Sequence, residues 1–158
     1  MQVVKRNGQC EAVDFNKITR RLHNLATDTN IGTTIDIDPI IVAQKVVSSI
    51  HNNITTHDLD TLASEISASL ATSNPSYGVL AARIVASDLQ KETPDSFMVA
   101  MNSLWSDKLI SKEVIDVCIE HSERIENEIL SDNDYLFDYF GLKTLQKAYL
   151  FKDSKGNT

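Results

Sequence analysis

The sequence predicts a mainly α-helical protein with a small β element. We expect a four-helix bundle capped by a short β-hairpin or a three-stranded sheet, followed by additional helices. Near the N-terminus, two short runs flank Asn7-Gly8, a strong hairpin signal because both residues tolerate positive φ. Amphipathic helical segments with short connections then follow through residue 91, which favours antiparallel packing. A hairpin of this size is not stable alone, so it should cover the bundle.

The first helix is expected from Phe15 to about residues 27–30, because apolar residues recur there at three- and four-residue steps. Either Asp14 or Asn16 can cap its N-terminus. Residues 31–37 contain three isoleucines around Gly32. They fit a short strand that joins the hairpin, and they fit a plain loop equally well.

The second helix is expected to begin at Asp38-Pro39, an N-cap followed by proline, and to end near Ile50. It is apolar over more than half of its circumference, which predicts a central position. Thr55, with Asp58 three residues later, indicates the start of the third helix. Its buried stripe is expected to be apolar: Leu59, Leu62, Ala63, Ile66 and Leu70.

The fourth helix is expected from about Ser76 to Lys91, after the break at Asn74-Pro75. The next break, Glu92-Thr93-Pro94-Asp95, is the best internal boundary. The sequence therefore predicts a first domain at residues 1–92 and a helical region at residues 93–158.

In the second region, a fifth helix is expected around residues 97–104, and a sixth around the apolar residues of 114–125. A turn at 131–134 and a short helix over 142–148 should follow. Residues 149–152 are interpreted as a strand, with a hairpin turn at 153–157. A strand without a returning partner leaves an unpaired edge, so we expect this end to be a cut through a larger protein.

Composition excludes several classes of function. The net charge of −7 over 158 residues argues against direct nucleic-acid binding and against an anionic membrane surface. Cys10 and Cys118 are the only cysteines, which favours free thiols over a disulfide, and no Cys/His cluster has zinc spacing. No stretch of about 18 apolar residues occurs, so a cytoplasmic protein is expected.

No familiar catalytic motif is present, and the four histidines are scattered, as expected of surface or cap residues. The N-terminal 21 residues are different, because they carry five cations against two acids. Lys5 and Arg6 sit at the hairpin turn, and Lys17 sits in the first helical turn, where free N–H groups and the helix dipole also favour anions. Both an anion site and a solvated basic face fit this pattern.

These residues also carry a family resemblance. Residues 3–8 (VVKRNG) and 11–18 (EAVDFNKI) resemble the opening of an ATP-cone, the allosteric nucleotide-binding domain at the N-terminus of many ribonucleotide reductases. Residues 54–63 and 75–84 resemble the starts of its third and fourth helices. Residues 138–150 (DYFGLKTLQKAYL) resemble the helical region that leads to the catalytic barrel of the class I large subunit, in its eukaryotic and viral forms.

The resemblance implies a site for ATP as activator or dATP as inhibitor, with magnesium. It implies that Lys5, Arg6 and Lys17 contact phosphate, and that Asp60 bonds the adenine amino group or a ribose hydroxyl. The full implied set is Lys5, Arg6, Glu11, Ala12, Val13, Asp14, Phe15, Asn16, Lys17, Thr56, Asp60 and Lys91. Implied partners are other large subunits and the small radical-generating subunit. Asn7 stands where the family often has Asp, and both residues suit the turn.

The catalytic cysteines and the barrel of such reductases do not match any part of this chain, so we expect the chain alone to be inactive and to hold no catalytic cofactor. Two alternatives stay open. One is a helical interaction module with a degenerate nucleotide site. The other is an ATP-cone transcriptional regulator, although such regulators carry a zinc ribbon and this chain has no CxxC.

Overall fold

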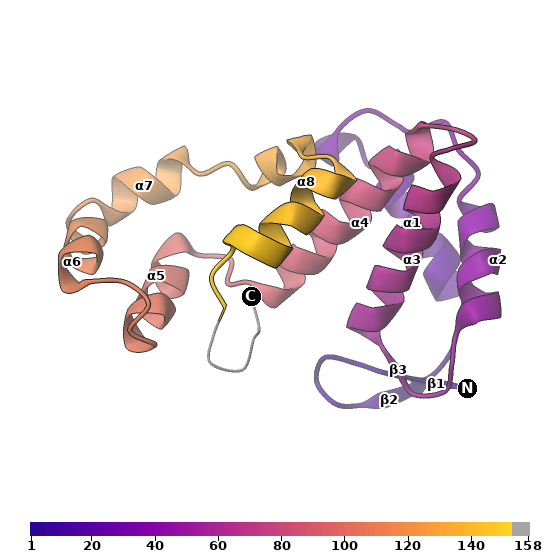
Figure 1. Cartoon of the computed structure of the whole chain (residues 1–158), viewed down its shortest axis with the longest axis horizontal. Coiled ribbons are helices and arrows are strands. Elements are labelled where there is room, and N and C mark those ends of the chain that lie inside the picture. The colour runs from indigo at the N-terminus through magenta and orange to yellow at the C-terminus, as the bar shows by residue number, and fades with distance from the viewer. Residues whose placement is uncertain (153–158) are drawn as a thin grey trace.

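The computed structural model describes residues 1–152 (Figure 1). The hairpin and the four helices of the bundle follow the predicted order. In chain order the strands and helices are β1 (Gln2–Val4), β2 (Cys10–Ala12), α1 (Phe15–Thr27), η1 (Thr29–Ile31), α2 (Pro39–Ser49), β3 (Ile54–Thr55), α3 (Thr56–Leu70), α4 (Ser76–Glu92), α5 (Phe97–Ser106), α6 (Lys112–Glu120), α7 (Ser122–Glu128), η2 (Ser131–Leu136), α8 (Tyr139–Thr144) and η3 (Leu145–Tyr149).

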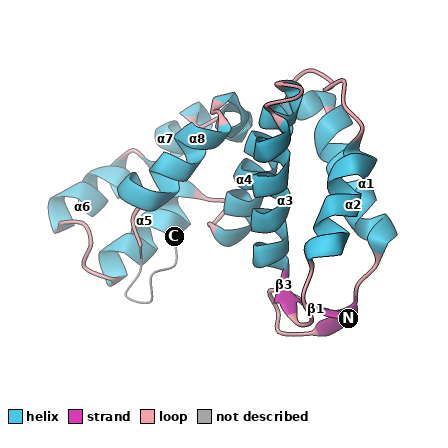
Figure 2. Ribbon diagram, turned by 45° about the vertical axis from the view of Figure 1, so that its right-hand side comes forward, coloured by secondary structure: helices cyan, strands magenta, loops and turns pink. Residues whose placement is uncertain are grey.

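The predicted hairpin is confirmed, and its strands form the edge (β2) and the centre (β1) of a three-stranded sheet of order β2-β1-β3. Its turn closes with the Gly8 amide donating to the Lys5 carbonyl at 2.8 Å, and Gly8 adopts a φ of 80°. Only the glycine of the Asn7-Gly8 pair therefore uses the left-handed region. The sheet lies across the ends of the bundle helices (Figure 2).

The third strand is β3, which runs parallel to β1 with Val3 opposite Ile54. The interpretation of residues 31–37 as a strand is wrong, and the loop alternative holds. This loop uses its backbone groups elsewhere: the Ile35 amide donates to the Ala26 carbonyl at 2.8 Å, and the Thr33 carbonyl accepts from Arg83 Nη2 at 2.7 Å. These bonds leave little of the loop backbone for a sheet ladder.

The helices of the bundle begin where the sequence predicts. Asp14, rather than Asn16, caps α1 by accepting from the Asn16 amide, and Asp38 caps α2 in the same way. The Asp58 amide donates to Thr55 Oγ1 at 3.0 Å at the start of α3. These side chains satisfy amides that have no partner within the helix.

The central helix is α4, not α2 as its composition predicts. Ile40 and Ile41 of α2 are 46% and 41% exposed, so its apolar surface is only partly covered. One side of α4, with Leu80 and Ile84, belongs to the main core with the other bundle helices and the sheet. Its other side packs against α8, and this second contact makes α4 the most enclosed helix.

The buried face of α3 is more polar than predicted. Ala63 is buried, while the leucines and isoleucine of the expected stripe are only partly buried against the core. The most enclosed side chains of α3 besides Ala63 are Asp60, Ser64 and Ser67. Both serine hydroxyls donate to carbonyls of their own helix, which satisfies them without water.

Helices α5, α6 and α7 pack on one another and extend away from the bundle (Figures 1 and 2). The predicted sixth helix is two helices that are broken at His121. Its buried residues are Ile115 and Cys118, whereas Val114 and Val117, two of the apolar residues that suggested this helix, are 44% and 54% exposed.

The last described segment returns to the bundle, where Leu142 of α8 packs against Ala82 and Ala86 of α4. The strand expected at residues 149–152 is wrong, because the chain continues from α8 into the π-helical turn η3 and then runs without regular structure. The turn expected at 153–157 lies outside the described residues. Within residues 1–152, no helix is both long and apolar enough to cross a membrane.

Candidate functional site

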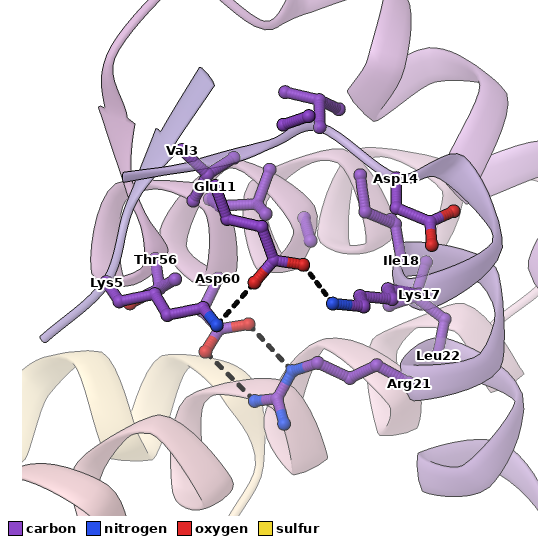
Figure 3. Close-up of a pocket in the computed structure, with 14 residues that line it drawn as sticks. Val3, Lys5, Glu11, Asp14, Lys17, Ile18, Arg21, Leu22, Thr56 and Asp60 are labelled. Atoms are coloured by element: carbon purple, nitrogen blue, oxygen red, sulfur yellow. Dashed lines mark hydrogen bonds and ion pairs between the residues drawn. The ribbon is translucent and has the colours of Figure 1, made fainter. Parts of the chain in front are cut away.

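A cavity of about 160 Å³ lies between the hairpin, α1 and α3 (Figure 3). Its wall combines aliphatic side chains with charged groups that belong to the segments predicted as a site. The lining residues are Val3, Lys5, Glu11, Ala12, Val13, Asp14, Lys17, Ile18, Arg21, Leu22, Thr56, Leu59, Asp60 and Ala63. The cavity therefore offers an apolar interior with a polar rim.

Helical spacing places the charged residues of α1 on this cavity. Lys17 and Arg21 are one turn apart and lie on one face of the helix. Ile18 and Leu22 lie beside them and are buried in the core, which anchors that face of α1. Thr56 and Asp60, also one turn apart, face the cavity from α3.

Glu11 lies between two lysines at the rim. It pairs with Lys17 of α1 and with Lys5 of the hairpin (Figure 3). The hydrogen bonds from Lys17 and then from Lys5 lower the pKa of Glu11 to about 2. Glu11 thus ties the hairpin to α1, and it neutralises part of the positive charge on the two lysines.

Asp60 holds two other cations. Its carboxylate accepts from Arg21 Nε at 2.8 Å and from Arg21 Nη2 at 2.9 Å, and Lys91 Nζ lies 3.3 Å from Oδ2. Burial lowers the pKa of Lys91, an effect that the charge of Asp60 opposes. This cluster joins α1, α3 and α4 beside the cavity.

Arg6 extends from the hairpin turn to α4, where it pairs with Asp88. Asp88 is only 4% exposed, and burial, followed by the charge of Asp60, raises the pKa of its carboxyl. The other oxygen of Asp88 lies 2.8 Å from His57 Nδ1, which is also 2.8 Å from Glu92 Oε1. A second group of titratable residues therefore adjoins the first.

Eight of the twelve predicted site residues line the cavity. Arg6 and Lys91 do not line it, but Arg6 Nη2 and Lys91 Nζ lie 4.0 and 3.3 Å from Asp60 Oδ2. Phe15 and Asn16 are outside the lining and exposed at the start of α1. The structure thus brings ten of the twelve residues into one connected cluster.

Sequence reasoning missed Arg21 and Asp88. Arg21 follows Lys17 by four residues, so helical periodicity could have placed it on the same face. Asp88 precedes Lys91 by three residues on α4, which gives a weaker signal of the same kind. Its partner Arg6 is 82 positions away, a pairing that only the fold reveals.

The cluster has the chemistry of a site for an anionic ligand with an aromatic or aliphatic part. Five cations, Lys5, Arg6, Lys17, Arg21 and Lys91, contact four carboxylates, Glu11, Asp60, Asp88 and Glu92. One positive charge is left in excess on an otherwise acidic chain. The adjoining cavity can bury an apolar ring.

Comparison with known proteins connects this geometry to a family. The model of the ATP cone domain matches residues 1–92. The chain is 41% identical over 161 residues to the ribonucleoside-diphosphate reductase large subunit of Vaccinia virus (strain Copenhagen), covering 96% of this chain and 20% of the relative. The same subunit of Arabidopsis thaliana is 39% identical over 162 residues, covering 96% and 19%. That of Danio rerio is 37% identical over 161 residues, covering 96% and 20%. The chain spans about a fifth of the length of these curated relatives.

Proposed function

This chain belongs to the ATP-cone family, and on that premise we propose that its N-terminal 92 residues bind ATP or dATP as an effector. The observation that carries the proposal is the cavity beside Lys5 and Lys17, whose apolar interior meets a cationic rim. A purine is a flat, largely apolar group, and a triphosphate is a compact polyanion. The two parts of the site suit the two parts of the ligand.

The size of the cavity suggests how the nucleotide would lie. At about 160 Å³ it is smaller than the roughly 300–1,000 Å³ that drug-sized ligands occupy, so it would take the base while the phosphates lie along the rim. Lys5, Arg6 and Lys17 would contact the phosphates, and Thr56 and Asp60 would bond the adenine or the ribose. Magnesium would bind mainly through the phosphates and water, as it commonly does.

Binding would require the present ion pairs to rearrange. Lys5 and Lys17 already share Glu11, and Arg6 already pairs with Asp88. A triphosphate would compete with these carboxylates for the same cations. Each exchange shifts the hairpin relative to α1 or α4, so ligand binding would be coupled to the position of the hairpin.

The relatives suggest the larger context. We propose that the chain is a regulatory part of a cytoplasmic ribonucleoside-diphosphate reductase and acts in deoxyribonucleotide synthesis. Bound nucleotide would alter how large subunits assemble with one another or with the radical-generating subunit, as a coupling between two equilibria. On this proposal the chain alone reduces no substrate.

Calorimetry with ATP, dATP and GTP tests the proposal directly. We expect the adenine nucleotides to bind, and Lys17→Ala to weaken ATP binding by about tenfold or more, the value of one charge-assisted hydrogen bond. Lys45→Ala is the matched control, because Lys45 is exposed on α2 away from the cavity. Size-exclusion chromatography in the presence of each nucleotide tests whether nucleotide binding changes the assembly state.

Two results would contradict the proposal. Absence of adenine-nucleotide binding at millimolar concentration would favour a helical interaction module with a degenerate site. Equal affinities for wild type and Lys17→Ala would remove Lys17 from the phosphate contacts.

A further inference from the structure

His57, Asp88 and Glu92 form a cluster at the junction of α3 and α4, outside the lining of the cavity. His57 lies in the first turn of α3, and the two acids lie one turn apart on α4. His57 Nδ1 is 2.8 Å from Asp88 Oδ2 and 2.8 Å from Glu92 Oε1. The three potential ligand atoms all lie within 4.8 Å of one another.

The ring nitrogen at the centre of the cluster has no hydrogen-bond partner. His57 Nδ1 is buried from solvent, and neither nearby carboxylate oxygen is placed to make a hydrogen bond with it. If Nδ1 carries no proton, its lone pair faces two carboxylate oxygens at close range, which is unfavourable. If Nδ1 is protonated, its single N–H makes a hydrogen bond with neither of the two oxygens.

A metal ion resolves this arrangement, because one cation can accept electron pairs from all three atoms. Imidazole nitrogen and carboxylate oxygen are ligands for first-row metals such as Zn²⁺ and Co²⁺, at about 2.0–2.2 Å from the ion. We propose that His57, Asp88 and Glu92 are the protein ligands of a first-row transition-metal ion. Three protein ligands leave at least one coordination position for water.

The surroundings of the cluster support the assignment. Asp88 Oδ1 accepts from Arg6, so the oxygen that faces His57 is held in place by an outer contact of the kind that orients metal-binding carboxylates. The His57 and Glu92 side chains are 44% and 30% exposed, which leaves an entry path from solvent. Glu92 can adjust its position, because it lies at the exposed end of α4.

The proposed metal site and the proposed nucleotide site have no ligand residue in common. None of its three ligands lines the cavity, and none belongs to the residues proposed to contact the nucleotide. The two sites communicate through Asp88, which would give one oxygen to the metal ion and the other to Arg6. Metal binding without nucleotide is therefore the appropriate test, and its failure would leave the proposed nucleotide site unaffected.

The experiment is titration of the untagged chain with ZnCl₂ by calorimetry and with CoCl₂ by visible absorption, without nucleotide. We expect one ion per chain, and d–d bands that report coordination by nitrogen and oxygen. His57→Ala and Glu92→Gln should each weaken binding more than about tenfold, since even outer-shell losses cost 10–100-fold. Circular dichroism verifies that each variant is folded.

Matched controls exclude unspecific binding. His23→Ala and Glu120→Gln alter an exposed histidine and an exposed glutamate elsewhere, and they should bind the ion as wild type does. If wild type binds no ion, the proposal is wrong. It is equally wrong if folded His57→Ala and Glu92→Gln both keep wild-type affinity, because the ion then binds elsewhere.

Discussion

Arg21 and Asp60 form a two-point ion pair, with Nε to Oδ1 at 2.8 Å and Nη2 to Oδ2 at 2.9 Å. The two residues are 39 positions apart, and their bond joins α1 to α3 at the side of the cavity (Figure 3). Because the guanidinium is planar and the carboxylate matches its fork, the pair sets the relative orientation of the two helices as well as their separation.

Asp60→Asn should destabilise the fold. The change keeps the shape of the side chain but removes the charge that Arg21 and Lys91 share, at a residue that is 7% exposed. We expect the free energy of unfolding to fall by about 1–3 kcal/mol, measured by urea denaturation. Asp36→Asn, at an exposed loop residue, should stay within about 0.5 kcal/mol. Equal losses in the two variants would contradict a structural role for the pair.

Arg83 should be a strong determinant of stability. It is 3% exposed, and its guanidinium donates to the carbonyls of Leu25 at 2.8 Å and Thr33 at 2.7 Å. Arg83→Met would leave these carbonyls without their donor, at a cost of roughly 1–3 kcal/mol for each buried group left unsatisfied. Thermal or urea unfolding measures the loss. Arg20→Met, on the exposed face of α1, should unfold as wild type does.

Gly32→Ala should be costly for two reasons. Gly32 has a φ of 135°, which side chains rarely adopt, and an added Cβ would lie 2.7 Å from Arg83 Nη2. We expect a loss of about 1–3 kcal/mol from the strained backbone alone. Gly78→Ala is the control, since its Cβ would make an ordinary contact at 3.5 Å with Ala71, and alanine favours helix over glycine. If the two variants are equally stable, the loop does not need glycine.

The pairing of Glu11 with its lysines predicts an acid-dependent loss of stability. Its pKa falls from 4.5 to about 2 in the folded protein, so the stabilisation is present above about pH 4.5 and is lost as the pH falls toward 2. The measurement is the free energy of unfolding in urea, for wild type and for Glu11→Gln, at several values between roughly pH 6 and pH 3. The stability difference between them should shrink with acid, and a constant difference would contradict the assignment.

Local patterns predicted most of the helices correctly. Asp14, Asp38 and Thr55 sit directly before the segments that they cap, and a cap acts on amides two or three residues away. The hairpin was predictable from Asn7-Gly8 because a tight turn, like a cap, depends on residues that are only a few positions apart. Where the prediction failed, as for residues 31–37 and 149–152, apolar β-favouring residues were read as strands although their backbone groups have other partners.

The part of the candidate site that lies on the hairpin and on α1 could also be located from local sequence patterns. The cavity-lining charges of the hairpin and α1 lie within 20 residues of one another, from Lys5 to Arg21, so their proximity follows from one turn and one helix. The groups on α3 and α4 could be proposed only through a family resemblance. Nothing in their local sequence indicates that Asp88 meets Arg6, or that His57 meets Glu92.

The sequence by itself determined where the helices of the bundle begin and where the hairpin turns. It also determined that the N-terminal 21 residues are positively charged in an otherwise acidic chain. Those features depend on residues a few positions apart. Only the tertiary structure decided which helix is central, which strand completes the sheet, and which carboxylate partners each cation. Such pairings join the hairpin, α1, α3 and α4 across 31 to 82 positions. They depend on how whole helical faces pack, and no local propensity encodes that packing.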